Sequence, residues 1–175
     1  TEIKMPSKAN HIGFGAFNSC KQLEAIRIPE GVTILYYTTF WDCNNLKSII
    51  LPNSLTTIEN GVFVDCDSLS TITFPDSLVK IGNYTFGYCD ALDSITIPAS
   101  VTDIGTEPFG YCNNLKSLQV AEGNPKYDSR DNCNAIIETA TNKMAVGCAA
   151  TIIPEGITTL GTYAFSGIYL PKIVL

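Results

Sequence analysis

The sequence predicts a repeat solenoid, a fold in which short similar coils stack along one axis. Phenylalanine, cysteine and leucine each recur every 23 residues, and a fixed period of roughly 20–50 residues is the signature of such stacks. In addition, 45% of the 175 residues are hydrophobic and only 16% are charged, so the chain can bury a sizeable core. The three columns are Phe17, Phe40, Phe63, Phe86 and Phe109; Cys20, Cys43, Cys66, Cys89 and Cys112; and Leu23, Leu46, Leu69, Leu92 and Leu115.

The segment that follows each leucine predicts a short β-strand. From Leu92 to Ile97, apolar and polar residues alternate as they do in a strand with one buried face. Proline then ends the strand, because it has no N–H to donate to a neighbouring strand. It does so at Pro29, Pro52, Pro75 and Pro98. Stacking the units therefore predicts one parallel β-sheet, on the concave face of the solenoid.

The second half of each unit predicts turns rather than helices. Its apolar residues are three to five positions apart, in the columns Val32, Leu55, Leu78, Val101 and Leu35, Ile58, Ile81, Ile104. About eleven residues cannot hold a long helix and its turns, so we expect short 3₁₀ or turn-like segments on the convex side.

One segment breaks the period. Regular repeats cover residues 3–120, but after Phe109 the phenylalanine column resumes only at Phe165, so one of the two intervening units is longer than the others. The extra residues fall in an irregular insertion over residues 121–151. There, two β-prone runs, Ala135–Thr139 and Met144–Val146, flank the polar residues 141–143 and predict a β-hairpin that projects from the solenoid. The repeat resumes over residues 152–175.

Both ends of the sequence lie inside a coil. Ile3 and Met5 fit the register one unit earlier, and Leu170, Ile173 and Leu175 continue it at the other end. Residues 1–175 therefore form a single solenoid that we expect to be a fragment of a longer array. The exposed end of a solenoid can pair with the end of another copy, so self-association end to end is a possible partner interaction.

The consensus of the units resembles the BspA-like leucine-rich repeat, also called the Treponema pallidum type. The closest matches to that motif are residues 97–105, which read IPASVTDIG, and residues 160–165, which read LGTYAF. The insertion also resembles a variant unit of these proteins, notably from Bacteroidetes. Tyr36 and Glu59 replace the usual glycine, Pro108 an alanine, and Ile168 the last cysteine. The resemblance implies a secreted or surface-anchored adhesin of a host-associated bacterium, and hence an extracellular or cell-surface location.

Composition excludes several classes of function. The net charge of −6 and the pI of about 4.6 argue against a nucleic-acid partner, which requires basic patches. No apolar run has the roughly 18 residues that a membrane-spanning helix needs. His11 is the only histidine, so we expect no multi-histidine metal centre, no cofactor and no nucleophile–base pair of an enzyme.

The cysteines divide into two groups. The five in the repeat column predict a buried ladder of free thiols, because a small, weakly polar side chain suits the corner before each strand. Cys133 and Cys148 both lie in the insertion. They are either free or joined by a disulfide across the base of the hairpin.

Acidic residues also fall into columns. Asp42 and Asp65 share one column, and Asp67 and Asp90 share the second column after it. A cluster of oxygen ligands on adjacent coils could bind a cation such as calcium. A solvated acidic patch is the alternative that we favour.

The outward positions of the strands are the first candidate binding surface, because solenoids usually bind ligands on this face. They comprise Arg27, Ile50, Thr71, Thr73, Ser94, Thr96, Ser117 and Gln119, with Ala25 and Ser48 beside them. The same residues could instead reflect β-propensity on a solvated surface.

Aromatic residues outside the core columns form a rival surface, because Tyr and Trp are favoured in interfaces. They are Tyr36, Trp41, Tyr84, Tyr88 and Tyr111. The alternative is that these rings merely cover the edge of the core.

The sequence therefore predicts a non-catalytic binding module that attaches to host or microbial proteins or glycans through the concave sheet face. The alternative is a structural spacer or self-associating stalk that has no ligand of its own.

Overall fold

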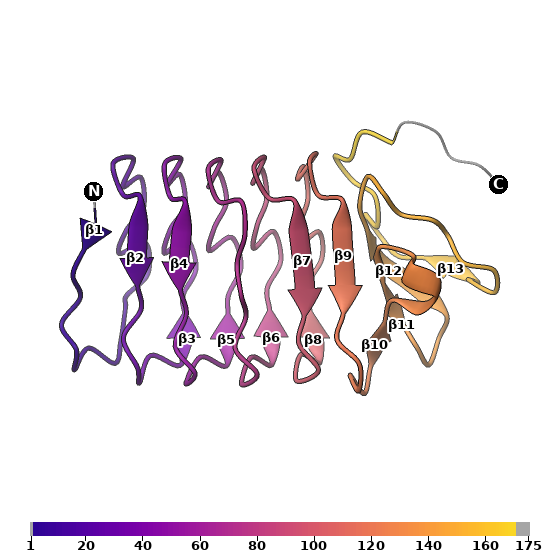
Figure 1. Ribbon diagram of the computed structural model, residues 1–175, viewed down its shortest axis with the longest axis horizontal. Coiled ribbons are helices and arrows are strands. Elements are labelled where there is room, and N and C mark those ends of the chain that lie inside the picture. The colour runs from indigo at the N-terminus through magenta and orange to yellow at the C-terminus, as the bar shows by residue number, and fades with distance from the viewer. Residues whose placement is uncertain (1, 171–175) are drawn as a thin grey trace.

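The computed structural model describes residues 2–170, which form the predicted solenoid. The coils stack side by side along the long axis of the molecule, with the N-terminus and the insertion at opposite ends (Figure 1). Within the described residues the only helix is a single 3₁₀ turn, η1 (Arg130–Asn132), and it lies in the insertion. Ile173 and Leu175, which the sequence assigns to the last coil, lie outside the described residues.

The strands after the leucine column lie on one side of the solenoid, which we call the strand face (Figure 1). β1 (Glu2–Ile3), β2 (Ala25–Arg27) and β4 (Ser48–Ile50) form a parallel sheet, and β7 (Ser94–Ile97) and β9 (Ser117–Val120) form a second one. The register follows the sequence period, since Ile26 pairs with Ile49 and Thr96 pairs with Gln119. The single predicted sheet is therefore two parallel sheets with a gap between them.

The gap is the segment Thr71–Phe74, which lies between β4 and β7 but forms no strand. Its backbone N–H and C=O groups make no hydrogen bond to any other described residue. Phe74 occupies the column that holds Ile28 and Ile97 in other coils, and its ring meets the Phe86 ring edge-on with centroids 5.9 Å apart. We attribute the gap to this larger side chain, which keeps the segment Thr71–Phe74 from pairing with β4 and β7 although β6 (Lys80–Ile81) of the same coil pairs with both of its neighbours.

A second ladder runs along the opposite side of the solenoid, where the sequence predicted only turns and 3₁₀ segments. It consists of four parallel two-residue strands, β3 (Ile34–Leu35), β5 (Thr57–Ile58), β6 (Lys80–Ile81) and β8 (Asp103–Ile104). Turns connect it to the strand face, and the described part of the regular repeats contains no 3₁₀ helix. Each coil is thus flattened between two ladders.

Each coil turns a corner immediately before its cysteine. The residue at that position has a left-handed backbone conformation in every coil, with φ of 56° at Ser19, 60° at Asp42, 58° at Asp65, 61° at Tyr88 and 63° at Tyr111. This conformation is unfavourable for residues with a Cβ atom, yet none of these five residues is a glycine. Acidic and aromatic side chains are consequently displayed along one edge.

Stacked phenylalanines form the centre of the core. The rings of Phe40 and Phe63 are 5.5 Å apart and 3° from parallel, and the rings of Phe63 and Phe86 are 5.1 Å apart. All three side chains are fully buried. The predicted ladder of free thiols lies beside them. Four of the five thiols, those of Cys43, Cys66, Cys89 and Cys112, donate to the carbonyl oxygen of the phenylalanine one coil earlier, as Cys66 Sγ does to Phe40 at 3.2 Å.

The insertion contains the predicted hairpin, but the hairpin does not project. β11 (Ala135–Glu138) and β12 (Lys143–Gly147) are antiparallel, β10 (Tyr127–Asp128) adds to β11, and β13 (Thr159–Leu160) runs parallel to β12. Both faces of the hairpin are apolar. Ile136 and Val146 join the main core, and Ile137 and Met144 pack against Ile157 and Phe165. The hairpin therefore lies between the regular coils and the resumed repeat.

Candidate functional site

The outward positions of the strand face form two columns, and most of their side chains are exposed. Arg27, Ser48, Ile50, Thr71, Thr73, Ser94 and Thr96 are exposed, whereas Ala25, Ser117 and Gln119 are half-buried. Gln119 donates a hydrogen bond from Nε2 to Asn134 Oδ1 at 2.9 Å, so the insertion occupies this end of the face. Sequence reasoning missed Lys4, although it lies one repeat unit before Arg27 in the same column.

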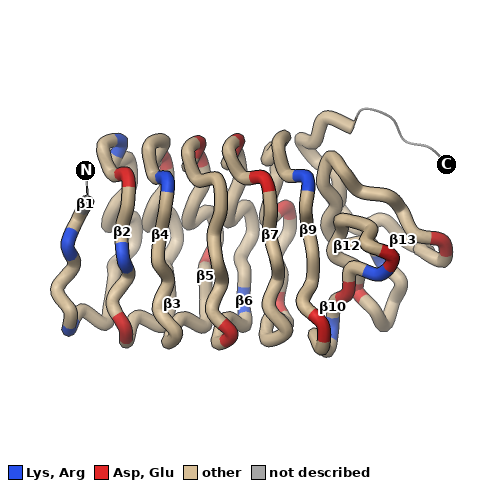
Figure 2. The backbone as a smooth tube through the Cα atoms, viewed as in Figure 1, with Lys and Arg blue, Asp and Glu red and all other residues tan. Residues whose placement is uncertain are grey.

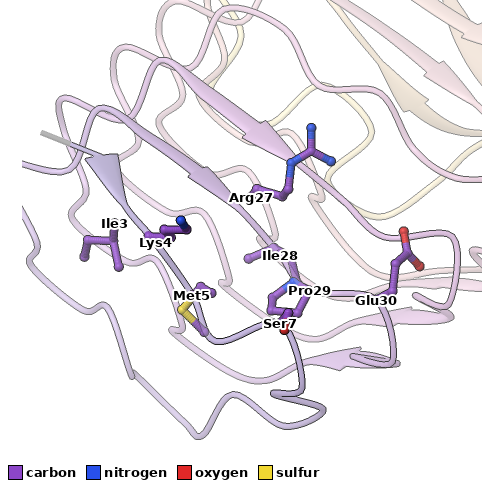
Figure 3. A pocket seen from close by; sticks show the side chains of 8 residues that line it. All are labelled: Ile3, Lys4, Met5, Ser7, Arg27, Ile28, Pro29 and Glu30. Carbon is purple, nitrogen blue, oxygen red and sulfur yellow. The ribbon is translucent and has the colours of Figure 1, made fainter.

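The strand face is hollowed at two places where the pairing of its strands stops. Hollows of about 330 Å³ and 480 Å³ flank the gap segment and share Thr73, Phe74 and Asp76. A larger hollow of about 680 Å³ lies between the first two coils, after β1 and β2 cease to pair (Figure 3). Its lining residues are Ile3, Lys4, Met5, Ser7, Arg27, Ile28, Pro29 and Glu30. All three hollows are shallow sites on an open surface, which suits extended ligands.

The five predicted edge aromatics do not form one surface. Tyr88 and Tyr111 stack with ring centroids 4.4 Å apart. Tyr36 lies elsewhere and packs against His11 and Phe14, with centroids 5.1 Å and 5.0 Å away. Trp41 is half-buried.

Tyr84 is tied to a carboxylate that sequence reasoning did not single out. Its hydroxyl donates a hydrogen bond to Glu107, whose side chain is buried. This bond, together with partial burial, raises the pKa of Tyr84 to about 12. Glu107 lies one repeat unit after Tyr84, so the period could have pointed to the pair. The contact joins adjacent coils and limits how freely Tyr84 can turn toward a ligand.

The acidic columns are not gathered into a cation site. The Asp42 carboxylate lies 3.2 Å from the Lys21 ammonium, which lowers the pKa of Asp42, and Asp67 accepts a hydrogen bond from Asn44 Nδ2 at 3.2 Å. Burial, followed by repulsion from Asp67 and Asp42, raises the pKa of Asp65. Asp90 is exposed. Among residues 2–170, no three His, Cys, Asp or Glu side chains form a group that could hold a metal ion.

Cys133 and Cys148 are free thiols in the structure. Cys148 belongs to the main core and donates from Sγ to Asn134 O at 3.3 Å, whereas Cys133 belongs to the separate cluster around Met144. The hairpin thus places the two side chains in different apolar clusters, which explains why its base carries no disulfide.

We expect thiol reagents to separate the seven cysteines by burial. Six thiols are buried and only Cys20 is half-exposed. Burial also raises the pKa of Cys43 to about 11 and that of Cys66 and Cys89 well above its usual range, so their reactive thiolates are rare at mildly alkaline pH. Iodoacetamide at mildly alkaline pH should alkylate Cys20 first, as mass spectrometry of the native protein would report. Equal labelling of Cys66 and Cys20 under native conditions would contradict the buried ladder.

The only histidine offers no catalytic arrangement, because His11 is exposed and packs on Tyr36. No helix within the described residues is long and apolar enough to cross a membrane.

Comparisons with known proteins agree with this geometry. The family model described as "BspA type Leucine rich repeat region" matches residues 1–124 with six copies, and no curated protein matches the chain. Neither the family match nor the similar structures indicate an enzymatic family.

Several solved structures share the fold, among them those of three leucine-rich proteins. A Treponema pallidum leucine-rich repeat protein is 26% identical with a TM-score of 0.69, and the match covers 91% of this chain and 68% of that one. A leucine-rich repeat protein from Eubacterium ventriosum is 26% identical with a TM-score of 0.74, over 87% of this chain and 41% of that one. A leucine-rich cell surface protein from Faecalibacterium prausnitzii is 25% identical with a TM-score of 0.71, over 95% of this chain and 52% of that one.

The chain thus spans about half or less of the latter two proteins. The family model covers well over half of this chain, and the repeating coils it describes are those of the structure. The protein belongs to the BspA-type leucine-rich repeat family.

Proposed function

We propose that this chain is a non-catalytic binding module of a secreted or cell-surface protein, and that it binds a protein ligand on its strand face. The family supports a binding role, and a similar structure from Faecalibacterium prausnitzii is described as a cell surface protein. The strand face has no exposed aromatic ring at its outward positions among the described residues, so it lacks the flat platform on which sugars stack. This favours a protein ligand over a glycan.

The gap segment carries the proposal. Thr71 and Thr73 are exposed, and the backbone groups of Thr71–Phe74 have no partner among the described residues. Backbone N–H and C=O groups on a partly enclosed surface gain free energy when a ligand supplies the missing hydrogen bonds. Asp76 and the hydroxyl of Thr96 line the adjoining hollow and add further polar partners. An extended segment of a protein ligand can pair with all of these groups.

A pull-down against extracellular-matrix proteins and immobilised glycans tests the proposal. Thr73→Glu and Thr96→Glu place a bulky charge beside the gap and should reduce capture of a protein ligand at least about tenfold, because an unpaired charge at an interface is costly. Thr162→Glu is the matched control, since Thr162 is exposed but belongs to the resumed repeat. The Thr162→Glu variant should capture as much ligand as the unmodified chain does.

Three results would contradict the proposal. Unchanged capture by the Thr73 and Thr96 variants, with loss in Tyr88→Ala, would move the site to the tyrosine edge. Capture of glycans alone would overturn the protein ligand. Capture of nothing, together with concentration-dependent rods in size-exclusion scattering, would favour a spacer that associates end to end.

A further inference from the structure

The outer column of the strand face carries charge at one end only. This column reads Lys4, Arg27, Ile50, Thr73, Thr96 and Gln119, so two cations on neighbouring coils are followed by four uncharged residues. Figure 2 shows the two basic positions on the first two coils of the strand face. Over the whole sequence the net charge is −6, so this basic end runs against the overall charge.

Neither cation has a counter-ion within residues 2–170. The Lys4 ammonium and the Arg27 guanidinium make no hydrogen bond or ion pair with another described residue. By contrast, Lys47 Nζ lies 2.9 Å from Glu24 Oε2, and Lys80 Nζ lies 2.9 Å from Asp103 Oδ2. Lys4 directly follows β1 and Arg27 is the last residue of β2. Each comes one residue after the register pair Ile3 and Ile26, so the two cations occupy matching positions on adjacent coils. Like charges in that position repel, and an anion between them removes the repulsion.

The hollow beside these cations has an apolar floor. Ile3, Met5, Ile28 and Pro29 line it, and Lys4 and Arg27 line its outer side (Figure 3). Its volume of about 680 Å³ is within the usual range for sites that bind small groups. Glu30 is the remaining charged residue of the lining, and its Oε1 accepts a hydrogen bond from the backbone N–H of Asn53 at 3.4 Å.

We propose that this hollow binds an extended segment of a protein partner in which an acidic side chain neighbours an apolar one. The carboxylate lies between Lys4 and Arg27, and the apolar side chain enters the hollow above Met5 and Pro29. A uniformly charged polysaccharide satisfies the cations but leaves the apolar floor in contact with water, so the lining favours a peptide. Ile50, of which 48% is exposed, lies next in the column and offers a second apolar contact.

This inference rests on the proposed function, since it assigns the chemistry of the ligand at one end of the same face. The probe is a short, end-capped, fluorescein-labelled peptide that alternates aspartate with leucine, and fluorescence anisotropy measures its binding to the chain. Lys4→Gln and Arg27→Gln should each weaken binding about threefold, and the double variant about tenfold, as expected for partly exposed ion pairs. Binding should also weaken when the salt concentration rises to about 0.5 M.

Matched controls make the result specific. Lys116→Gln removes an exposed cation with no ion-pair partner among the described residues at the other end of the face, and should leave binding unchanged. A peptide with asparagine in place of aspartate, or serine in place of leucine, should bind at least about fivefold more weakly.

Failure to bind the alternating peptide, or binding that the Lys4 and Arg27 variants do not change, would overturn the inference. Equal binding of the serine peptide or of a heparin fragment would show a site for any polyanion, and would overturn the peptide ligand. The proposed function has its own readout, because loss of matrix-protein capture in Thr73→Glu can persist when the alternating peptide does not bind.

Discussion

Replacing Phe63 with alanine is expected to lower the free energy of unfolding by about 3–5 kcal/mol, the usual cost of removing a buried phenylalanine. Phe63 is fully buried in the middle of the ring stack, 5.5 Å from Phe40 and 5.1 Å from Phe86. Its removal leaves a cavity that two rigid neighbouring coils cannot fill by collapsing, since backbone hydrogen bonds hold both in place. Phe63 N, for example, donates to Thr85 O at 2.8 Å.

Urea unfolding followed by circular dichroism measures this loss. Phe14→Ala is the matched control, because 70% of Phe14 is exposed, and it should change the stability by no more than about 0.5 kcal/mol. Phe63→Leu retains most of the apolar volume and should fall between the two. Equal midpoints for Phe63→Ala and Phe14→Ala would mean that the ring stack does not hold the coils together.

The inward residues could be predicted because the period itself identifies them. Phe40, Cys66 and Leu92 belong to columns that repeat once per coil, and a side chain that recurs in every coil at the same position is one that contacts its own copies. The structure places all three in the core. The free thiols of the ladder follow from the same logic, because stacked coils hold neighbouring cysteines parallel to each other.

The local departures could not be predicted because they depend on distances between coils. Phe74 fits the apolar pattern of its column as well as Ile97 does, and only the structure shows that the segment Thr71–Phe74 forms no strand. The sequence predicts the hairpin, but the burial of the hairpin depends on Ile137 and Met144 meeting Phe165 from the next coil. A pattern of polar and apolar residues indicates which side chains are buried, but it does not indicate which element covers them.

The candidate site likewise combines features that the sequence predicts with features that only the structure shows. Arg27 and Thr73 are exposed on the strand face, as the alternation of the strand predicts. The hollows around them arise where strand pairing stops, and no residue type signals that point. Lys4 could have been found from the period alone. Only the structure shows that neither Lys4 nor Arg27 has a counter-ion among the described residues.

Two glycines of one repeat column are expected to respond in opposite directions when changed to alanine. Gly13 and Gly105 both lie in the column that also holds Tyr36, Glu59 and Gly82. A Cβ atom built on Gly105 would lie 2.5 Å from the backbone nitrogen of Asn83 and 2.6 Å from the carbonyl carbon of Gly82. A Cβ atom on Gly13 would have no neighbour within 4 Å.

Gly105→Ala should therefore destabilise the protein by at least about 2 kcal/mol, because the clash is with backbone atoms that cannot turn aside. The adjoining chains are fixed by two hydrogen bonds, from Gly105 N to Ile81 O at 2.8 Å and from Thr106 N to Asn83 Oδ1 at 2.7 Å. Gly13→Ala should instead stabilise it by about 0.4–1 kcal/mol, because alanine restricts the unfolded chain and costs nothing in the folded one.

Calorimetric melting of the two variants beside the unmodified chain measures both effects, and a loss of stability in both would contradict the assignment. Tyr36 and Glu59 show that the column accepts a Cβ atom in two coils, so glycine is not required by the repeat as such. It is required where the backbones of neighbouring coils approach most closely. A melting temperature that falls for Gly105→Ala and rises for Gly13→Ala would therefore show that neighbouring backbones are closely packed at Gly105, directly after β8, and not at Gly13.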